Sequence, residues 1–461
     1  MYNICIIGAS FNWTRTIVYD MMAVFPERLH FRLVDLNPEA AEVCRQWGEL
    51  ATKWCGRQDT FSAFTERRQA LPGADAVFIA IATGGFDAMT NDLLIPEKYG
   101  IYGTVGDTAG PGGWSRAIRN IPVFAEMARD FDELCPEAFI VNYTNPMSAL
   151  TATLDRLCGN PVVGLCHSYI QTKNVLQHIF GLEDWSELSV SIAGMNHFSW
   201  VTDFKIGRRD GYAALRERIG GGSLLDLMRM EEPDANGFVS GHRLCAALYD
   251  TYGYIPYVGD RHTVEFLSYT LSNEPKRYTF SGPDGVQDDV LDHYGIKRTS
   301  LEARQRRAAG FKGRIQKEIA EFAAALAVDE PEAGQPIKSE EPSAELVRAY
   351  LTNSPMTEVV NMLNVGQIPG LPLGACVETF GMIDGLGIRP VMVDNVPESL
   401  LEIMRPQAIN QKWVTEGVLT RNKGLLLQAL YNDPQCKGLT PDRIRAMAEE
   451  LLEANKRWFT L

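Results

Sequence analysis

The first 200 residues alternate short apolar runs with segments of helical periodicity, and this alternation is the strongest constraint on the fold. The apolar runs end in small or polar residues and cover positions 3–7, 31–35, 76–80, 138–142, 162–165 and 190–193. Such alternation is typical of a parallel sheet with helices on both faces. We therefore expect an α/β fold with a Rossmann-like, doubly wound parallel sheet, whose ligands bind at the carboxyl ends of the strands.

The chain changes character near residue 200. Residues 205–250 are charged and helix-like, residues 252–282 are rich in Tyr, Gly and Pro, and residues 299–328 have a long helical pattern. The acidic segment DEPEAGQPIKSEEPS (329–343) is expected to be a solvated loop, and the remainder to be mostly helical around NVGQIPGLPLGA (364–375). The sequence thus predicts a first domain over 1–200 and a mixed, largely helical second domain over 201–461.

Composition excludes some partners. The net charge of -14 argues against nucleic-acid binding, which needs a basic surface. No apolar stretch reaches the roughly 18–20 residues of a membrane span. The chain begins directly with a strand-like segment, and its nine cysteines have no regular spacing. We expect a soluble, cytoplasmic protein with reduced thiols.

Three strand ends in the first half suit a dinucleotide. The turn IIGAS places Gly8 and Ser10 between a strand and a helical pattern, where a glycine lets a pyrophosphate approach the backbone. A plain strand–helix turn is the alternative, since the pattern GxGxxG is absent. Asp35 at the second strand end can accept both ribose hydroxyls and favours NAD over NADP. Thr83 and Gly84 at the end of FIAIATGG complete a predicted NAD site.

Three further strand ends carry groups that can bind a metal. NYTNPM (142–147), GLCHSY (164–169) and GMNHF (194–198) present these side chains: Asn145, Cys166, His167, Asn196 and His197. A thiolate and an imidazole converging on one point suit a borderline divalent cation. The adjacent Cys166 and His167 could equally be core residues, or a nucleophile with its base, when their stretch is considered alone.

These three stretches, preceded by GDTAGPGGWSRAIRNIP (106–122), resemble glycoside hydrolase family 4, the NAD- and manganese-dependent glycosidases. The resemblance continues through YGYIPYVGDRHTVEF (252–266), NVGQIPGLP (364–372) and VLTRNKGLLLQALYNDP (418–434), and so covers almost the whole chain. It is strongest for the branch that contains α-galacturonidases and related α-glycosidases. An NAD-dependent sulfoquinovosidase that acts without metal is the related alternative.

The resemblance implies roles for individual residues. Cys166 and His197 would bind the divalent metal, Asn145 would contact the sugar hydroxyls, and the loop 107–113 would lie over the junction of cofactor and sugar. The residues assigned to the NAD site are Gly8, Ser10, Asp35, Thr83, Gly84 and Asn142. His167 is interpreted as the acid to the leaving oxygen or as a contact to a sugar hydroxyl, and Asn196 as a further substrate contact.

The implied reaction is a redox-assisted elimination. NAD oxidises the sugar at C3, the resulting ketone acidifies the proton at C2, a base removes that proton, and the glycosidic oxygen leaves. Water then adds, and hydride returns from NADH. Most glycosidases use a pair of carboxylates, but this route does not, and family 4 is one of the few known exceptions.

The base and the substrate's charge are less directly indicated. Phe266 occupies the position nearest to a tyrosine that serves as base in some relatives, so we assign the base to Asp260, with Tyr257 as second choice; Asp260 could instead pair with Arg261. Arg261, His262, Arg243 and His242 form a cationic group that suits a carboxylate or sulfonate, because guanidinium binds planar oxyanions bidentately. The predicted substrate is therefore an anionic hexoside, and a surface charge cluster is the alternative interpretation of this group.

The turn after the first predicted strand departs from the family pattern in two ways. The turn GASFNWT is one residue shorter than the family pattern, and Phe11 and Trp13 are bulky for it.

Two other functions compete with that of a glycosidase. A lactate/malate-type NAD dehydrogenase would have a similar first domain, and a non-catalytic NAD or sugar sensor would bind its ligand without cleaving it. The resemblance further implies a homodimer or homotetramer that acts on a small-molecule glycoside.

Overall fold

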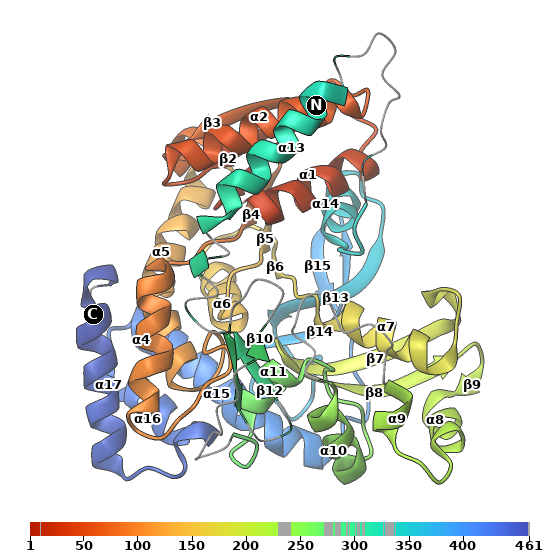
Figure 1. Cartoon of the computed structure of the whole chain (residues 1–461), viewed down its shortest axis with the longest axis vertical. Helices are drawn as coiled ribbons and strands as arrows, with labels where there is room; N and C mark the ends of the chain where they lie inside the picture. The colour runs from red at the N-terminus through yellow and green to blue at the C-terminus, as the bar shows by residue number, and fades with distance from the viewer. Residues whose placement is uncertain are drawn as a thin grey trace.

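The computed structural model describes residues 1–9, 11–228, 241–271 and 338–459, together with parts of the stretch from 280 to 336. Its centre is one large mixed sheet (Figure 1). The parallel strands are β1 (Tyr2–Ile7), β2 (Leu29–Val34), β3 (Thr60–Phe64), β4 (Ala76–Ile79), β5 (Phe139–Asn142) and β6 (Val162–Gly164), and they lie in the order β3-β2-β1-β4-β5-β6. This half confirms the predicted Rossmann-like architecture and adds β3 to it.

Antiparallel strands extend the sheet beyond β6. They are β13 (Met356–Leu363), β14 (Cys376–Asp384), β7 (Leu188–Met195), β8 (Phe198–Ile206) and β9 (Arg209–Asp210), with β15 (Gly387–Pro390) beside β14. The prediction of a mostly helical region after about residue 344 is therefore wrong for residues 356–390. Because β13 and β14 stand between β6 and β7, they join the two halves of the sheet.

The helices cover both faces of the parallel strands. In chain order their bounds are α1 (Phe11–Val24), α2 (Pro38–Trp54), α3 (Arg67–Ala70), α4 (Gly85–Glu97), α5 (Gly110–Leu134), α6 (Met147–Leu157), α7 (Ser168–Phe180), α8 (Gly211–Ile219), α9 (Leu224–Met228), α10 (Arg243–Tyr252), α11 (Asp260–Thr263), α13 (Phe311–Ala325), α14 (Ser343–Leu351), α15 (Glu398–Leu419), α16 (Lys423–Asn432) and α17 (Pro441–Asn455). Short 3-10 turns are η1 (Trp185–Glu187), η2 (Val264–Phe266), η3 (Pro434–Cys436) and η4 (Lys456–Trp458), and a small second sheet contains β10 (Phe280–Ser281), β11 (Gln287–Leu291) and β12 (Ile296–Thr299).

Alternation along the strands explains the two layers. In β1, Cys5 and Ile7 join a core with α5, α6, α15 and α17, whereas Ile4 and Ile6 join a core with α1, α2 and α14. Side chains of successive strand residues point to opposite faces, so a run that is apolar throughout requires cover on both. Helices from the C-terminal part supply much of one layer, and Figure 1 shows the C-terminus beside α17, next to α4. The boundary near residue 200 stays a prediction.

The end of the acidic segment differs from the expected solvated loop. Ser339 donates from its backbone N–H and from its hydroxyl to the buried carboxylate of Asp20 on α1, both at 2.6 Å. Glu341 in the same stretch is only 5 % exposed. The prediction therefore fails for residues 338–343, while most of residues 329–337 lie outside the described residues.

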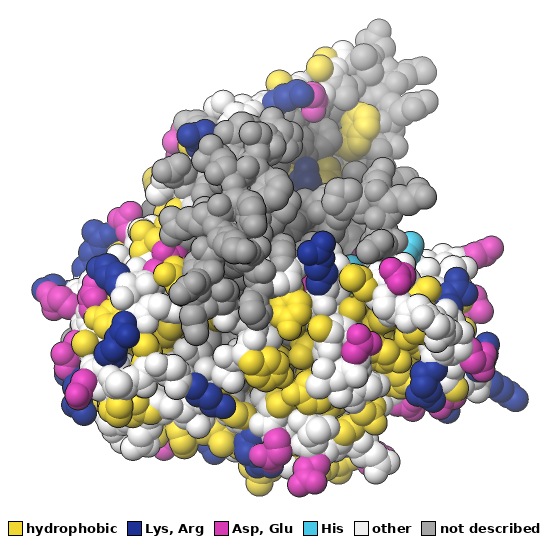
Figure 2. Space-filling model, turned by 60° about the horizontal axis from the view of Figure 1, so that its bottom comes forward, with side chains coloured by type: hydrophobic (Ala, Val, Ile, Leu, Met, Phe, Trp, Pro, Cys, Tyr) yellow, Lys and Arg dark blue, Asp and Glu magenta, His cyan; other side chains and the backbone are white. Residues whose placement is uncertain are grey.

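The surface carries charges of both signs. On the face drawn in Figure 2, basic and acidic side chains are interspersed around apolar ones, and the described part of that face has no basic stripe. Among the described residues, no helix combines the length and the apolar character needed to span a bilayer.

Candidate active site

A pocket of about 460 Å³ opens beside the carboxyl ends of β5 and β6. This volume is in the range of small-molecule sites. Its wall comes from α1, from the loop before α5, from the ends of β5, β6 and β7, from α6, α7 and α11, and from the segments before α11 and α14. The lining residues are Trp13, Thr16, Asp107, Tyr143, Asn145, Met147, Leu165, Cys166, His167, Gln171, His197, Tyr257, His262, Ser339 and Glu341. Six residues proposed from the sequence as site residues therefore share one pocket: Asn145, Cys166, His167, His197, His262 and Tyr257, the last as second choice for the base.

Asp107, His197 and His262 form the chemical centre of this pocket. Their potential ligand atoms all lie within 4.8 Å of one another. The two imidazole rings stack with centroids 3.6 Å apart, and His262 Nδ1 lies 3.9 Å from Asp107 Oδ1. Two imidazoles and a carboxylate suit divalent ions such as manganese or zinc, whose N and O ligands bind at about 2.0–2.2 Å.

The charges in this cluster favour the states that bind a metal. Burial lowers the pKa of His197 to about 4, so its ring is neutral at pH 7. Burial alone would raise the pKa of Asp107, but His262, His197 and Arg116 outweigh it and hold this pKa well below its usual range. A neutral imidazole beside an ionised carboxylate is a ready ligand pair.

His197 lies in the tight turn between β7 and β8, and its φ of 66° is in the left-handed region. Residues other than glycine adopt this conformation at a cost, and such strain clusters at functional sites. The Thr108 hydroxyl lies 3.1 Å from His197 Nδ1 and contacts Asp107 Oδ1 at 2.7 Å. The strained turn and these contacts hold the ring over the pocket.

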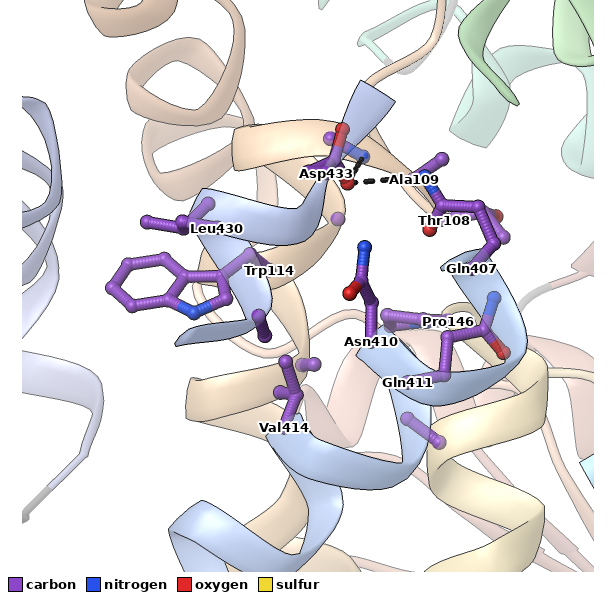
Figure 3. A pocket seen from close by; sticks show the side chains of 15 residues that line it. Thr108, Ala109, Trp114, Pro146, Gln407, Asn410, Gln411, Val414, Leu430 and Asp433 are labelled. Carbon is purple, nitrogen blue, oxygen red and sulfur yellow. Dashed lines mark hydrogen bonds between the residues drawn. The ribbon is translucent and has the colours of Figure 1, made fainter. Parts of the chain in front are cut away.

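The loop that carries Asp107 is fixed by two buried carboxylates. Glu265 Oε1 accepts hydrogen bonds from the backbone N–H groups of Val105 and Gly106, at 2.8 and 3.0 Å. Behind the loop, Asp433 Oδ2 accepts from Gly110 N–H at 3.2 Å and from Gln407 Nε2 at 3.0 Å, in the small cavity between α5 and α15 drawn in Figure 3. Both anchors come from the second half of the chain, so that half fixes a loop of the first.

Asn145 follows β5 and touches this loop. Its Nδ2 donates to Asp107 Oδ2 at 3.3 Å, and its carbonyl accepts from Arg116 Nε at 3.0 Å. Its place in the pocket is consistent with a contact to sugar hydroxyls, a role that stays a prediction.

Cys166 and His167 both line the pocket but face different partners. Burial, followed by the nearby carboxylate of Glu378, raises the pKa of the Cys166 thiol, so a thiolate there needs a cation beside it. The compact group of potential ligands contains His197 with Asp107 and His262, and it does not include Cys166. His167 Nδ1 lies 2.7 Å from Glu341 Oε1.

The predicted NAD residues lie along the adjoining strand ends. Gly8 has a φ of +83°, and a Cβ there would meet the carbonyl oxygen of Ala80 at 2.2 Å, so only glycine fits. Asp35 accepts from Asn37 N–H at 2.8 Å, and Gly84 begins the turn into α4 with a φ of +82°. Thr83 N–H donates to Asn120 Oδ1 at 3.4 Å.

Two of the residues predicted to bind NAD are Asn142 and Ser10. Asn142 is fully buried at the end of β5, where its Nδ2 donates to the Thr151 hydroxyl at 3.1 Å and its Oδ1 accepts from Thr144 N–H at 2.8 Å. Its side chain therefore holds the β5 turn. Ser10 lies outside the described residues.

Asp260 is not part of the pocket wall. Its carboxylate accepts hydrogen bonds from Leu244 and Cys245 N–H, both at 3.0 Å, and so caps the first turn of α10. Tyr257, the second choice for the base, does line the pocket, and its hydroxyl donates to Gln171 Oε1 at 2.9 Å. Position therefore favours Tyr257 over Asp260.

Of the predicted cationic group, only His262 lines the pocket. Arg261 is buried in α11, where its carbonyl accepts from the Thr104 hydroxyl, and Arg243 is exposed at the start of α10. His242 contacts the Val258 carbonyl at 3.2 Å. Asn196, proposed as a substrate contact, is fully buried and does not line the pocket either.

Sequence reasoning placed the loop 107–113 over the junction of cofactor and sugar but gave Asp107 no role as a metal ligand, and it did not assign Glu341 to the site. Asp107 lies in the stretch GDTAGPGG, where an acidic residue after a glycine, just before a helix, was a usable signal. Glu341 lies in a segment whose Pro and Glu content indicates a solvated loop, so its burial had no signal in the local sequence.

Comparison with known proteins identifies the chain's relatives. Residues 3–182 match the model of the family 4 glycosyl hydrolases, and residues 192–436 match that of the family 4 glycosyl hydrolase C-terminal domain. The alpha-galacturonidase of Bacillus subtilis is 31% identical over 438 residues, which cover 93% of this chain and 91% of that protein.

Solved structures agree over the whole length. The crystal structure of a Bacillus subtilis protein assigned as a glucosidase superposes with a TM-score of 0.83 at 28% identity, covering 98% of this chain and 100% of the other. A 6-phospho-alpha-glucosidase from gut microorganisms, solved in complex with NAD and Mn²⁺, has a TM-score of 0.76 at 18% identity, with 99% of each chain covered.

Proposed function

The chain belongs to family 4 of the glycosyl hydrolases, and on this premise we propose that it is an NAD-dependent glycosidase of an anionic hexoside, with an α-galacturonide as the first candidate substrate. The observation that carries the proposal is the pocket in which Asp107, His197 and His262 converge beside Asn145, Cys166 and Tyr257. This set contains metal ligands, a sugar-binding amide and a proton-transfer group within one small volume.

The strand ends support NAD as the cofactor. Gly8 lies in the turn between β1 and α1, and the Asp35 carboxylate follows β2; in such sheets these are the positions that meet the pyrophosphate and the ribose of the cofactor. The structurally similar phospho-glucosidase was solved with NAD and Mn²⁺. When bound, NAD would take and return the hydride at C3 of the sugar, and the metal would act as a Lewis acid at the neighbouring oxygens.

The donor set supports a divalent metal. We assign His197, His262 and Asp107 as its ligands, because their potential ligand atoms lie within 4.8 Å of one another. Cys166 is kept as a candidate ligand, since the thiol lies in the same pocket and its thiolate form requires a neighbouring cation.

The remaining pocket residues handle the sugar and its protons. Asn145 orients the ring through its hydroxyls, and Tyr257 takes the proton from C2. His167 contacts the leaving oxygen or a neighbouring hydroxyl. Proton transfer by positioned groups of this kind contributes about 10²–10⁴-fold to a reaction rate.

The anionic substituent is proposed because the chain is 31% identical over 438 residues to an alpha-galacturonidase. We further propose that the protein is cytoplasmic. We also propose that it forms a homodimer or homotetramer, and size-exclusion chromatography with light scattering measures this oligomeric state directly.

A panel of nitrophenyl glycosides tests the function. The α-galacturonide, α-glucuronide, α-sulfoquinovoside and α-galactoside are each incubated with the protein, with and without NAD and Mn²⁺. We expect nitrophenol release from the galacturonide only when both additives are present. Cleavage of the sulfoquinovoside in EDTA would instead assign a metal-free activity.

A further inference from the structure

The segment 338–341 is held firmly against α1. Ser339 makes two hydrogen bonds to the buried Asp20 carboxylate, each at 2.6 Å. Lys338 Nζ donates to the carbonyl of Glu341 at 2.8 Å, and Glu341 N–H donates to the Ser339 hydroxyl at 3.1 Å. The backbone of Glu341 is therefore fixed relative to α1.

The Glu341 side chain reaches from this segment to the end of β6. Its Oε1 lies 2.7 Å from Nδ1 of His167, and its side chain is 6% exposed against 37% for His167. Both residues line the pocket that contains Asp107 and His197. Burying a carboxylate costs free energy unless it is hydrogen-bonded. The contact with His167 therefore lowers the cost of burying the Glu341 side chain.

The contact with Glu341 sets which nitrogen of the His167 ring carries the hydrogen. An ionised carboxylate can only accept hydrogen bonds, so Nδ1 carries the hydrogen in this pair. A neutral ring then has its lone pair on Nε2. Histidines that act in catalysis commonly have one nitrogen fixed in this way by a carboxylate, which sets both the tautomer and the ring orientation.

From this geometry we propose that Glu341 is a positioning residue, which acts on the substrate through His167. Its carboxylate engages Nδ1 of the ring, and the inference assigns Nε2 as the nitrogen that serves the glycoside. The inference deepens the proposed function and rests on it for the identity of the ligand. It assigns a role to the end of the acidic segment, which the sequence indicated to be a solvated loop.

The test compares Glu341→Gln, Glu341→Leu, His167→Ala and the double variant His167→Ala/Glu341→Leu. The amide oxygen of glutamine still accepts from Nδ1–H, whereas leucine cannot. For 4-nitrophenyl α-galacturonide with NAD and Mn²⁺, we expect Glu341→Leu to lower kcat/KM by about 10- to 100-fold, the range for loss of one buried hydrogen bond. Glu341→Gln should stay within about 5-fold of the parent.

The double variant separates positioning from a general structural role. If Glu341 acts through His167, its replacement by leucine costs less than about 3-fold once the imidazole is absent, because residues in one hydrogen-bonded unit are not additive. Equal losses in both backgrounds, or full activity of Glu341→Leu, would overturn the inference. Glu340→Gln is the matched control, because its exposed carboxylate contacts Asn174 at 3.1 Å and not the pocket.

Calorimetric binding of galacturonic acid gives the same comparison without turnover. A parent protein that binds this sugar but cleaves no glycoside would contradict the proposed function, and the four variants would still test Glu341. Thermal unfolding of each variant identifies a loss of folding. Should Glu341→Leu not fold, the inference is decided by Glu341→Gln and His167→Gln, since it requires the first to be the milder change.

Discussion

His197 and His262 stack face to face with ring centroids 3.6 Å apart, although one follows β7 and the other lies in α11. Two imidazolium ions would repel each other at this distance, and burial holds the pKa of His197 at about 4. With Asp107 they form the group of potential ligands that defines the site.

Removing either of two ligands should abolish tight metal binding. We expect His262→Ala and Asp107→Asn each to weaken Mn²⁺ binding by at least 10- to 100-fold, the range seen even for residues that only support a ligand. Titration of Mn²⁺ followed by electron paramagnetic resonance measures the free ion directly. Glu340→Gln is again the control, and parent-like affinity in both variants would place the ion elsewhere.

Cobalt distinguishes the thiol from the histidines as a ligand. If Cys166 binds the metal, the Co²⁺-loaded protein has a thiolate-to-metal charge-transfer band that Cys166→Ser lacks. We expect this band, and a loss of Mn²⁺-dependent activity in Cys166→Ser. Unchanged activity of that variant in EDTA would remove Cys166 from the ligand set.

Tyr257 and Asp260 differ in what their loss should affect. Tyr257→Phe should suppress exchange of the C2 proton with solvent deuterium, because its hydroxyl belongs to the pocket wall. Asp260→Ala should leave exchange in place and lower the free energy of unfolding by about 1–2 kcal/mol, since the Asp260 carboxylate caps α10. Proton NMR of the sugar and thermal unfolding measure the two effects, and loss of exchange in folded Asp260→Ala would restore Asp260 as the base.

Because several buried carboxyl groups have raised pKa values, we expect the free energy of unfolding to fall as pH rises. Burial raises the pKa of Asp260, Glu265 and Glu378 to about 7 and that of Asp433 to about 6. A carboxyl with a raised pKa in the folded state stabilises the protein fully below its unfolded value, and this contribution is lost as pH rises through the folded value. The free energy of unfolding should therefore decrease between about pH 4.5 and 7.

Glu265→Gln provides the single-site check of this pH dependence. Taking about 1.4 kcal/mol per pKa unit, Glu265 alone accounts for roughly 3 kcal/mol over that range. Denaturant unfolding at pH 4.5 and 7 should show a smaller difference for the variant than for the parent. An identical difference would contradict the raised pKa of Glu265.

The parallel half of the fold was predictable, because each strand is a short apolar run that ends in polar residues. The predicted runs correspond to the parallel strands β1, β2, β4, β5 and β6 and to β7, which was expected to be parallel and is antiparallel. By contrast, MTEVVNML and CVETFGMID mix polar and apolar residues without a clear period, and the sequence did not reveal β13 and β14. Their partners lie far away in the chain, where Asn361 pairs with Gly164 and Glu378 with Gly194.

The site was partly predictable for a similar reason. Cys166 and His197 each follow an apolar run, and this marked both as strand-end residues, although β7 runs antiparallel to β6 and two strands separate them. Glu341 and Tyr257 reach the pocket from irregular segments, whose course depends on tertiary contacts such as Ser339 with Asp20. Local sequence patterns do not contain that information.

The balance of NAD against product tests the central claim most directly. The protein is incubated with Mn²⁺, an excess of 4-nitrophenyl α-galacturonide and NAD at a small fraction of the substrate concentration. Nitrophenol and NADH absorbance are then followed together. We predict that nitrophenol release exceeds the NAD supplied many times over while NADH does not accumulate. NADH formed in step with product, or no dependence of nitrophenol release on NAD, would contradict an NAD-dependent glycosidase.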